Sequence, residues 1–241
     1  MSEQGRVTSW SNWRINPKRL DFRRGMDVDM VFIVGGSPAM KPLLDVCGWM
    51  PDMFTALEKR TFELCRKVEH GRAKLVWFGD LYRDANAYRA SEFFDWSEAA
   101  ERLAEFTERE NPSELLAEGP KSTLETVFRV MRETEFCGET HLKRRHFIFL
   151  ITDCPAYRLD DPRRAETPEY PADMPNTLAG VEDIWEQMDP CAKRLIISSS
   201  DTGVCRALGL WTNAFSYPTC LTDGALDRGI VENAFCLLGG I

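Results

Sequence analysis

The feature that most constrains this chain is a set of short apolar runs without polar alternation, each followed by glycine or a small polar residue. The first run, Met30–Val34, has five consecutive apolar residues and is followed by two glycines and Ser37. Comparable runs occupy residues 75–78, 147–151 and 195–197. A strand that is apolar on both faces is typical of a parallel sheet with helices on either side, whereas a half-exposed strand alternates.

Helical patterns separate these runs, so the sequence predicts an α/β protein. The expected core is a doubly wound, mostly parallel sheet of six strands, flanked by helices and with one short antiparallel edge strand. The expected strands are residues 29–35, 74–80, 92–96, 147–151, 194–200 and 213–218. The expected helices are residues 52–69, 97–109, a segment carrying Leu124, Val127, Phe128 and Met131, then 181–188, 202–210 and 224–238. Gly71 is expected to end the first helix and Ser97 to cap the second.

The length of 241 residues suits one domain with an extension. Residues 1–26 are polar and rich in arginine, and we interpret them as an N-terminal extension to a domain formed by residues 27–241. Trp10 and Trp13 are expected to lie on the surface of that domain, with a partner-binding arm as the alternative.

Composition excludes several classes of function. The formal net charge of −8 argues against nucleic acid or an anionic membrane as the main partner. No apolar stretch approaches the ~18 residues of a membrane span, and the N-terminus lacks the apolar segment of a signal peptide. The eight cysteines lack the close spacing of zinc or thioredoxin motifs, and they are expected to be reduced thiols. These features predict a cytoplasmic protein.

Polar residues gather where the expected strands end. The carboxyl ends of parallel strands meet at one edge of a sheet, and ligands of open α/β sheets bind there, near the switch in strand order. The sequence therefore predicts a binding rim formed by the loops at residues 35–39, 80–84, 121–123 and 153–173. Its candidate residues are Gly35, Gly36, Ser37, Asp80, Arg83, Asp84, Lys121 and Asp153.

One chemistry for this rim is a metal site. Magnesium prefers six oxygen ligands, which Ser37, Asp153 and a hydroxyl of Ser122 or Thr123 could supply in part. With a single carboxylate, Mg²⁺ or Mn²⁺ is expected to bind weakly at best, and no other cofactor is expected. Asp80 is a candidate substitute for a second carboxylate. The alternative is that Asp80 caps a turn or pairs with Arg83.

Two other kinds of site, a hydrolase nucleophile and a phosphate-binding loop, fit the residues of this rim less well. Residues 35–39 have the glycines and serine of a nucleophile elbow, which would make Ser37 a hydrolase nucleophile and Asp153 its acid. Such an enzyme needs a histidine after the acid, but all three histidines of the chain precede Asp153. A phosphate-binding loop is also disfavoured, because the lysine of a P-loop and the spacing G-x-G-x-x-G are absent.

Three of these loops resemble, in order, the metal loops of the von Willebrand factor type A domain family. Residues 28–40 resemble its first strand and D-x-S-x-S loop, residues 119–128 its threonine loop, and residues 151–155 its Thr-Asp at the end of a strand. The resemblance covers about residues 27–240. It implies a Rossmann-like fold and a protein-binding module, in which a metal-ion-dependent adhesion site takes an acidic side chain from the partner.

The departures from the family pattern concern the metal ligands. Gly35 stands where the family has its aspartate, and Ala39 where it has its second serine. Ser37 and Asp153 match the pattern, and the threonine aligns with Ser122 or Thr123. The resemblance therefore implies a degenerate metal site in a non-catalytic adaptor that binds a protein partner through the rim. A metal-dependent binder with an unusual ligand set stays open as an alternative.

Overall fold

The computed structural model describes residues 26–38, 40–41, 50–55, 59, 68–136, 144–163, 167, 170–188, 193–199 and 203–217. Its strands are β1 (Met26–Val34), β2 (Val68–Phe78), β3 (Tyr88–Ala90), β4 (Phe94–Asp95), β5 (Arg144–Thr152), β6 (Lys193–Ser199) and β7 (Ala214–Tyr217). Its helices are α2 (Ala99–Glu110), α3 (Thr123–Glu133), α4 (Leu178–Gln187) and α5 (Val204–Leu208), with short 3-10 turns η3 (Trp96–Glu98) and η4 (Pro112–Leu115).

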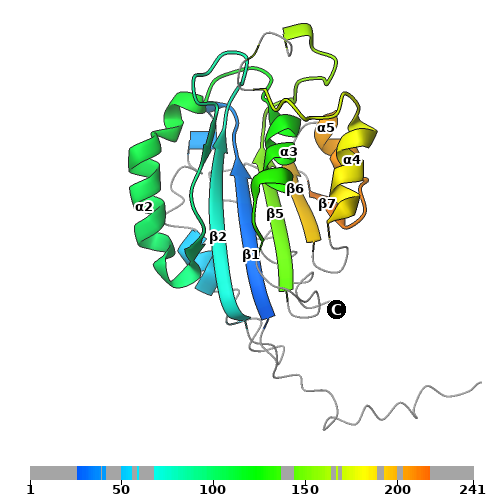
Figure 1. Ribbon diagram of the computed structural model, residues 1–241. Coiled ribbons are helices and arrows are strands. Elements are labelled where there is room, and N and C mark those ends of the chain that lie inside the picture. Colours follow the sequence, from blue (N-terminus) through cyan, green and yellow to red (C-terminus); the bar gives the residue numbers. More distant parts are fainter. Residues whose placement is uncertain are drawn as a thin grey trace, which may run out of the picture.

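The strands form a single sheet in the order β3-β2-β1-β5-β6-β7, with β4 also paired to β2. β2, β1, β5, β6 and β7 are parallel, whereas β3 and β4 run antiparallel to β2. This confirms the predicted mostly parallel α/β sheet, although its antiparallel part has two short segments instead of one. The chain goes from β1 outward to β2 and later returns to β5 on the other side of β1 (Figure 1), so the strand order reverses between β1 and β5.

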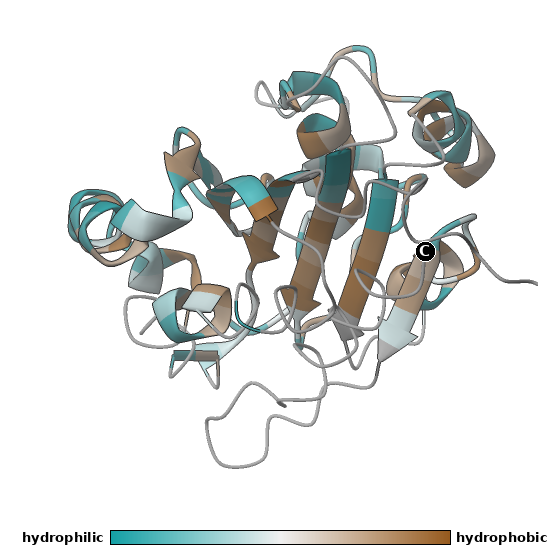
Figure 2. Ribbon diagram, turned by 90° about the horizontal axis from the view of Figure 1, so that it is seen from below, coloured by the Kyte–Doolittle hydropathy of each residue, from teal (hydrophilic) through white to brown (hydrophobic). Residues whose placement is uncertain are grey.

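Helices cover both faces of this sheet (Figure 1). Side chains alternate between the two faces along each strand, and both sets of the central strands are apolar. One face packs on α2 and includes Phe32, which stacks on Phe149 with ring centroids 4.8 Å apart. The other face packs on α3, α4 and α5. The middle of the central strands is accordingly hydrophobic in Figure 2. The buried stripe predicted for α3 is confirmed, since Leu124, Val127, Phe128 and Met131 are all buried.

Two predictions near β2 are wrong. β2 begins at Val68, so the expected helix cannot run to residue 69, and Gly71 lies inside a strand instead of ending a helix. A Cβ added at Gly71 would lie 2.4 Å from the ring of Trp96, so this glycine allows the tryptophan to pack directly on the strand.

The predicted cap of α2 is also wrong. Ser97 does not cap α2, because a 3-10 turn precedes the helix and Glu98 occupies the N-cap position without a side-chain bond.

Some predictions lie outside the described residues. They concern Trp10 and Trp13 of the extension, Ala39 of the first loop, and the last helix at residues 224–238. β1 begins at Met26, the last residue of the expected extension.

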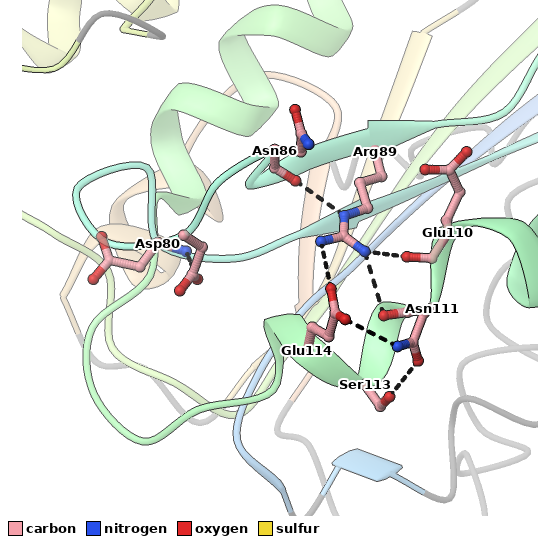
Figure 3. A network of polar contacts seen from close by, with 8 residues as sticks. Asp80, Asn86, Arg89, Glu110, Asn111, Ser113 and Glu114 are labelled. Carbon is pink, nitrogen blue, oxygen red and sulfur yellow. Dashed lines mark hydrogen bonds and ion pairs between the residues drawn. The ribbon is translucent and has the colours of Figure 1, made fainter.

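Arg89 on β3 ties the sheet edge to the end of α2 (Figure 3). Its guanidinium donates to the main-chain carbonyls of Asn86, at 3.1 Å, Glu110, and Asn111, at 3.3 Å. It also pairs with the carboxylate of Glu114 at 3.3 Å. A cation at a helix C-terminus satisfies carbonyls that have no partner within the helix and complements the helix dipole.

We expect Arg89→Ala to lower the free energy of unfolding by about 1–3 kcal/mol, because two carbonyls at the end of α2 lose a charged donor. Urea denaturation measures the change. Arg109→Ala is the matched control, since Arg109 lies in the last turn of α2 and its side chain is 66% exposed. Equal losses in the two variants would contradict a capping role for Arg89.

Candidate functional site

Ser37 and Asp153 meet at the point where the strand order reverses. Ser37 follows β1 and Asp153 follows β5, the two strands on either side of the switch. The Ser37 N–H donates to Asp153 Oδ1 at 2.8 Å, and the Ser37 hydroxyl donates to Asp153 Oδ2 at 2.5 Å. The Cys154 thiol also contacts Asp153 Oδ1, at 3.5 Å. The two residues that the sequence placed on a common rim are thus bonded directly to each other.

The two glycines before Ser37 leave no room for side chains. A Cβ added at Gly35 would lie 2.5 Å from the carbonyl oxygen of Phe78 and 2.6 Å from its ring. A Cβ added at Gly36 would lie 2.3 Å from Asp153 Oδ1. Since Phe78 is fully buried, its backbone and ring cannot easily withdraw. The position that aligns with the family's aspartate therefore has its side-chain space filled by β2.

Asp80 caps a turn at the end of β2. One carboxylate oxygen accepts from the Tyr82 N–H at 2.9 Å, and the other accepts from the Tyr157 hydroxyl at 2.7 Å. The Asp80 N–H in turn donates to the carboxylate of Asp84 at 2.8 Å. Arg83 bonds to Asp80 only through its main-chain N–H, and its side chain is exposed. Burial, together with the hydrogen bond to Asp80, raises the pKa of Tyr157.

The segment before α3 links the neighbouring loops. Ser122 Oγ accepts from the Leu81 N–H at 2.9 Å. Lys121 is buried, and its Nζ donates to the Leu115 carbonyl at 2.9 Å. Its main-chain N–H bonds to the loop after β5 at 2.8 Å. The Thr123 hydroxyl is buried and has no hydrogen-bond partner among the described residues.

The described residues do not fit the metal centre that the family resemblance implies. No group of three or more histidine, cysteine, aspartate or glutamate side chains in this part of the chain could hold a metal ion. Both oxygens of Asp153 accept from Ser37, and both oxygens of Asp80 are also bonded. Neither Ser122 nor Thr123 is hydrogen-bonded to Asp153 in the described structure. Magnesium is usually held by one or two carboxylates with waters completing its octahedral shell, and here the oxygens of both carboxylates are bonded within the protein.

Among the described residues, no histidine lies at the rim to act as a base for Ser37. His70 lies near the start of β2 and His146 near the start of β5, so both are at the opposite end of the sheet from Ser37. His141 lies outside the described residues. Cys154 is not an alternative nucleophile, because burial and the charge of Asp153 raise the pKa of its thiol to about 12. Its thiol is therefore protonated at neutral pH and is a poor nucleophile.

The sequence did not point to the aromatic cluster beside Asp80. The rings of Tyr82 and Tyr157 meet edge to face with centroids 4.8 Å apart, and the guanidinium of Arg163 lies 4.7 Å from each ring. These residues come from loops that are far apart in the sequence and carry no motif. The one available signal was the length of the loop after β5, because long loops next to strand ends are often functional.

Comparison with known proteins adds no assignment. No family model matches the chain, and no curated protein matches it. In the part of the chain that the structure describes, every helix is too short or too polar to cross a membrane.

We expect Ser37→Ala to lower the free energy of unfolding by about 1.5–3 kcal/mol, because the carboxylate of Asp153 loses its hydroxyl donor in a partly buried setting. Urea denaturation measures the change. Ser113→Ala is the matched control, since Ser113 makes an exposed side-chain bond to Asn111 at 2.6 Å. If the two variants are equally stable, the Ser37–Asp153 bond does not hold the rim together.

Proposed function

We propose that this protein is a non-catalytic, cytoplasmic adaptor of von Willebrand A type, which binds a protein partner through the rim at the carboxyl ends of its strands. The proposal assigns binding to the loops at residues 35–39, 80–84, 121–123 and 153–173, with no metal ion involved. The observation that carries it is the bond between Ser37 and Asp153 at the switch point. The carboxylate that would serve a metal or a nucleophile is instead used to join two loops.

Further contacts support a preformed binding surface. Lys121 bonds through its backbone to Pro155 and Tyr157, and its neighbour Ser122 bonds to the loop after β2. Tyr157 in turn bonds to Asp80, so the loops are tied to one another. A surface that is already ordered loses little conformational entropy on binding, which favours recognition of a partner.

Charge favours a protein as the partner. The net charge of −8 opposes binding to nucleic acid or to an anionic membrane surface. Exposed charged residues on the rim, such as Arg83 and Arg158, give it polar contact points for a folded or extended protein segment.

Site-specific photo-crosslinking in the native host tests this function. A photoreactive amino acid replaces Arg83 or Arg158 on the rim, and Glu101 on the exposed face of α2 serves as the control position. We expect discrete crosslinked proteins from the two rim positions but not from Glu101, with equal yield when a chelator is present.

Three results would contradict the proposal. Crosslinking that is equally strong at Glu101 would place the partner elsewhere, and crosslinking that a chelator abolishes would favour the metal-dependent alternative. Labelling of Ser37 by a fluorophosphonate probe would instead favour a hydrolase, because this reagent reacts with activated serine nucleophiles.

A further inference from the structure

A hollow of about 340 Å³ lies between α2 and the segment that joins β3 to β4, on the β2 side of the sheet (Figure 1). Part of its lining is aromatic and consists of Phe93, Phe94 and Phe106. The rest is polar and includes several charged side chains. Pockets for whole small molecules take about 300–1,000 Å³, so this hollow has room for one aromatic side chain and a neighbouring residue.

The carboxylates of this hollow outnumber the cations that neutralise them. Arg102 pairs with both Glu98 and Glu105, at 3.3 and 3.4 Å, and all three side chains are at least half exposed. Glu92 is exposed and forms no ion pair within the described part of the chain. Arg109, the other arginine of the lining, pairs with the glutamate that follows it. Three carboxylates therefore share one arginine through weak, exposed pairs, which favours the approach of a further cation.

The chain has a basic segment of its own to meet this charge. Residues 1–25, which lie outside the described residues, contain six arginine or lysine residues and two acids, a net charge of +4. Since the whole chain carries −8, residues 26–241 carry −12. Residues 92–110, which surround the hollow, include seven acids and two arginines. A basic segment that is tethered to an acidic domain meets it at a high effective concentration.

The tether is long enough to reach the hollow. The segment leads into β1 at Met26, which lies opposite Val68 on β2. On the other side of β2, Asp95 lies opposite Arg72, four residues further along. At about 3.3 Å per residue and 4.8 Å between strands, that end of the hollow is roughly 16 Å from Met26. The chain from Trp13 to Met26 spans about 40 Å when it is extended.

We propose that the N-terminal segment docks in this hollow, with the indole of Trp13 on the phenylalanine rings and Arg14 on the carboxylates of Glu98 and Glu105. Trp13 suits the hollow better than Trp10, because an arginine follows it, whereas Trp10 lies between two serines. A tryptophan buries a large apolar area and keeps an N–H donor, which matches a lining of phenylalanines and glutamates. The inference is independent of the proposed function, since no lining residue belongs to the loops of the rim.

Photo-crosslinking within the purified full chain tests this docking. Benzoylphenylalanine, a photoreactive aromatic amino acid, replaces Trp13, and dilute protein is irradiated and digested with trypsin. We expect intramolecular crosslinks to the tryptic peptides of residues 90–102 and 103–109, which contain the lining of the hollow. Mass spectrometry identifies the crosslinked peptides and measures their yield.

Variants without charge separate docking in the hollow from general attraction to an acidic domain. Glu98→Gln together with Glu105→Gln should lower the yield about fivefold, because two exposed charge contacts are lost. Asp173→Asn together with Asp183→Asn removes the same charge from exposed positions near α3 and on α4, and should leave the yield unchanged. Equal yields from the two double variants, crosslinks only to other peptides, no crosslinks, or crosslinked dimers, which would place a second copy in the hollow, would each overturn the assignment.

Discussion

Gly35→Asp, which restores the carboxylate of the von Willebrand A pattern, is expected to lower the free energy of unfolding by about 3 kcal/mol or more. The new Cβ would lie 2.5 Å from the carbonyl oxygen of Phe78, so the end of β1 or β2 must shift. The carboxylate would also enter a buried region beside the ring of Phe78 without a designed partner. Urea denaturation in a chelator and in Mg²⁺ measures the effect.

Gly35→Ala is the matched control, because it introduces the same Cβ without the charge. We expect Gly35→Ala to account for part of the loss, about 1–3 kcal/mol, and Gly35→Asp to be worse in both buffers. If Mg²⁺ makes Gly35→Asp as stable as the original protein, the loops have kept the shape of a metal site. Phe78 then does not exclude a side chain at residue 35.

Arg72→Ala is expected to lower the free energy of unfolding by about 2–4 kcal/mol, since it removes the half-exposed cation that pairs with a buried carboxylate. The guanidinium of Arg72 bonds to both oxygens of Asp29, at 3.0 and 2.8 Å, and Asp29 is 0% exposed. The two residues lie opposite each other on the neighbouring strands β2 and β1, so the pair also joins these strands in their N-terminal halves. Urea denaturation gives the magnitude.

Arg102→Ala provides the control for this prediction. Arg102 bonds to Glu98 and Glu105 on the surface of α2, and we expect no measurable loss on its removal. The double variant Asp29→Leu, Arg72→Met should recover much of the stability, because well-packed apolar residues can replace a buried pair. A loss in Arg72→Ala no larger than that in Arg102→Ala would show that Asp29 needs no counter-charge from β2.

The central strands were predictable because their sequence alone requires burial. The apolar runs of β1, β5 and β6 could only form strands covered on both faces, and the structure places all three side by side in the middle of the sheet. The helical spacing before residue 134 likewise predicted the buried stripe of α3. In each case the pattern is local, and the tertiary structure agrees with it.

The start of β2 was not predictable in this way. After Val68, residues 69–72 are three polar residues and a glycine, so they carry no strand pattern. They form a strand because Arg72 reaches Asp29 on the neighbouring strand and Gly71 lies under Trp96. Both partners are distant in the sequence, and tertiary contacts of this kind override local propensity.

The candidate site likewise has a part that the sequence predicted and a part that it did not. Parallel topology alone placed Ser37 and Asp153 on one rim, and the structure bonds them to each other. That Phe78 fills the space beside Gly35, and that Tyr157 takes an oxygen of Asp80, depends on packing between loops. No spacing in the sequence encodes those contacts.

Thermal melting in a chelator, in Mg²⁺ and in Mn²⁺ tests most directly whether the rim works without a metal. Any ion that binds only the folded state must raise the melting temperature. The bonded pair of Ser37 and Asp153 predicts the same melting temperature in all three conditions. A rise of several degrees with Mg²⁺ or Mn²⁺ that Asp153→Ala abolishes would contradict it and would establish a working metal site at this rim.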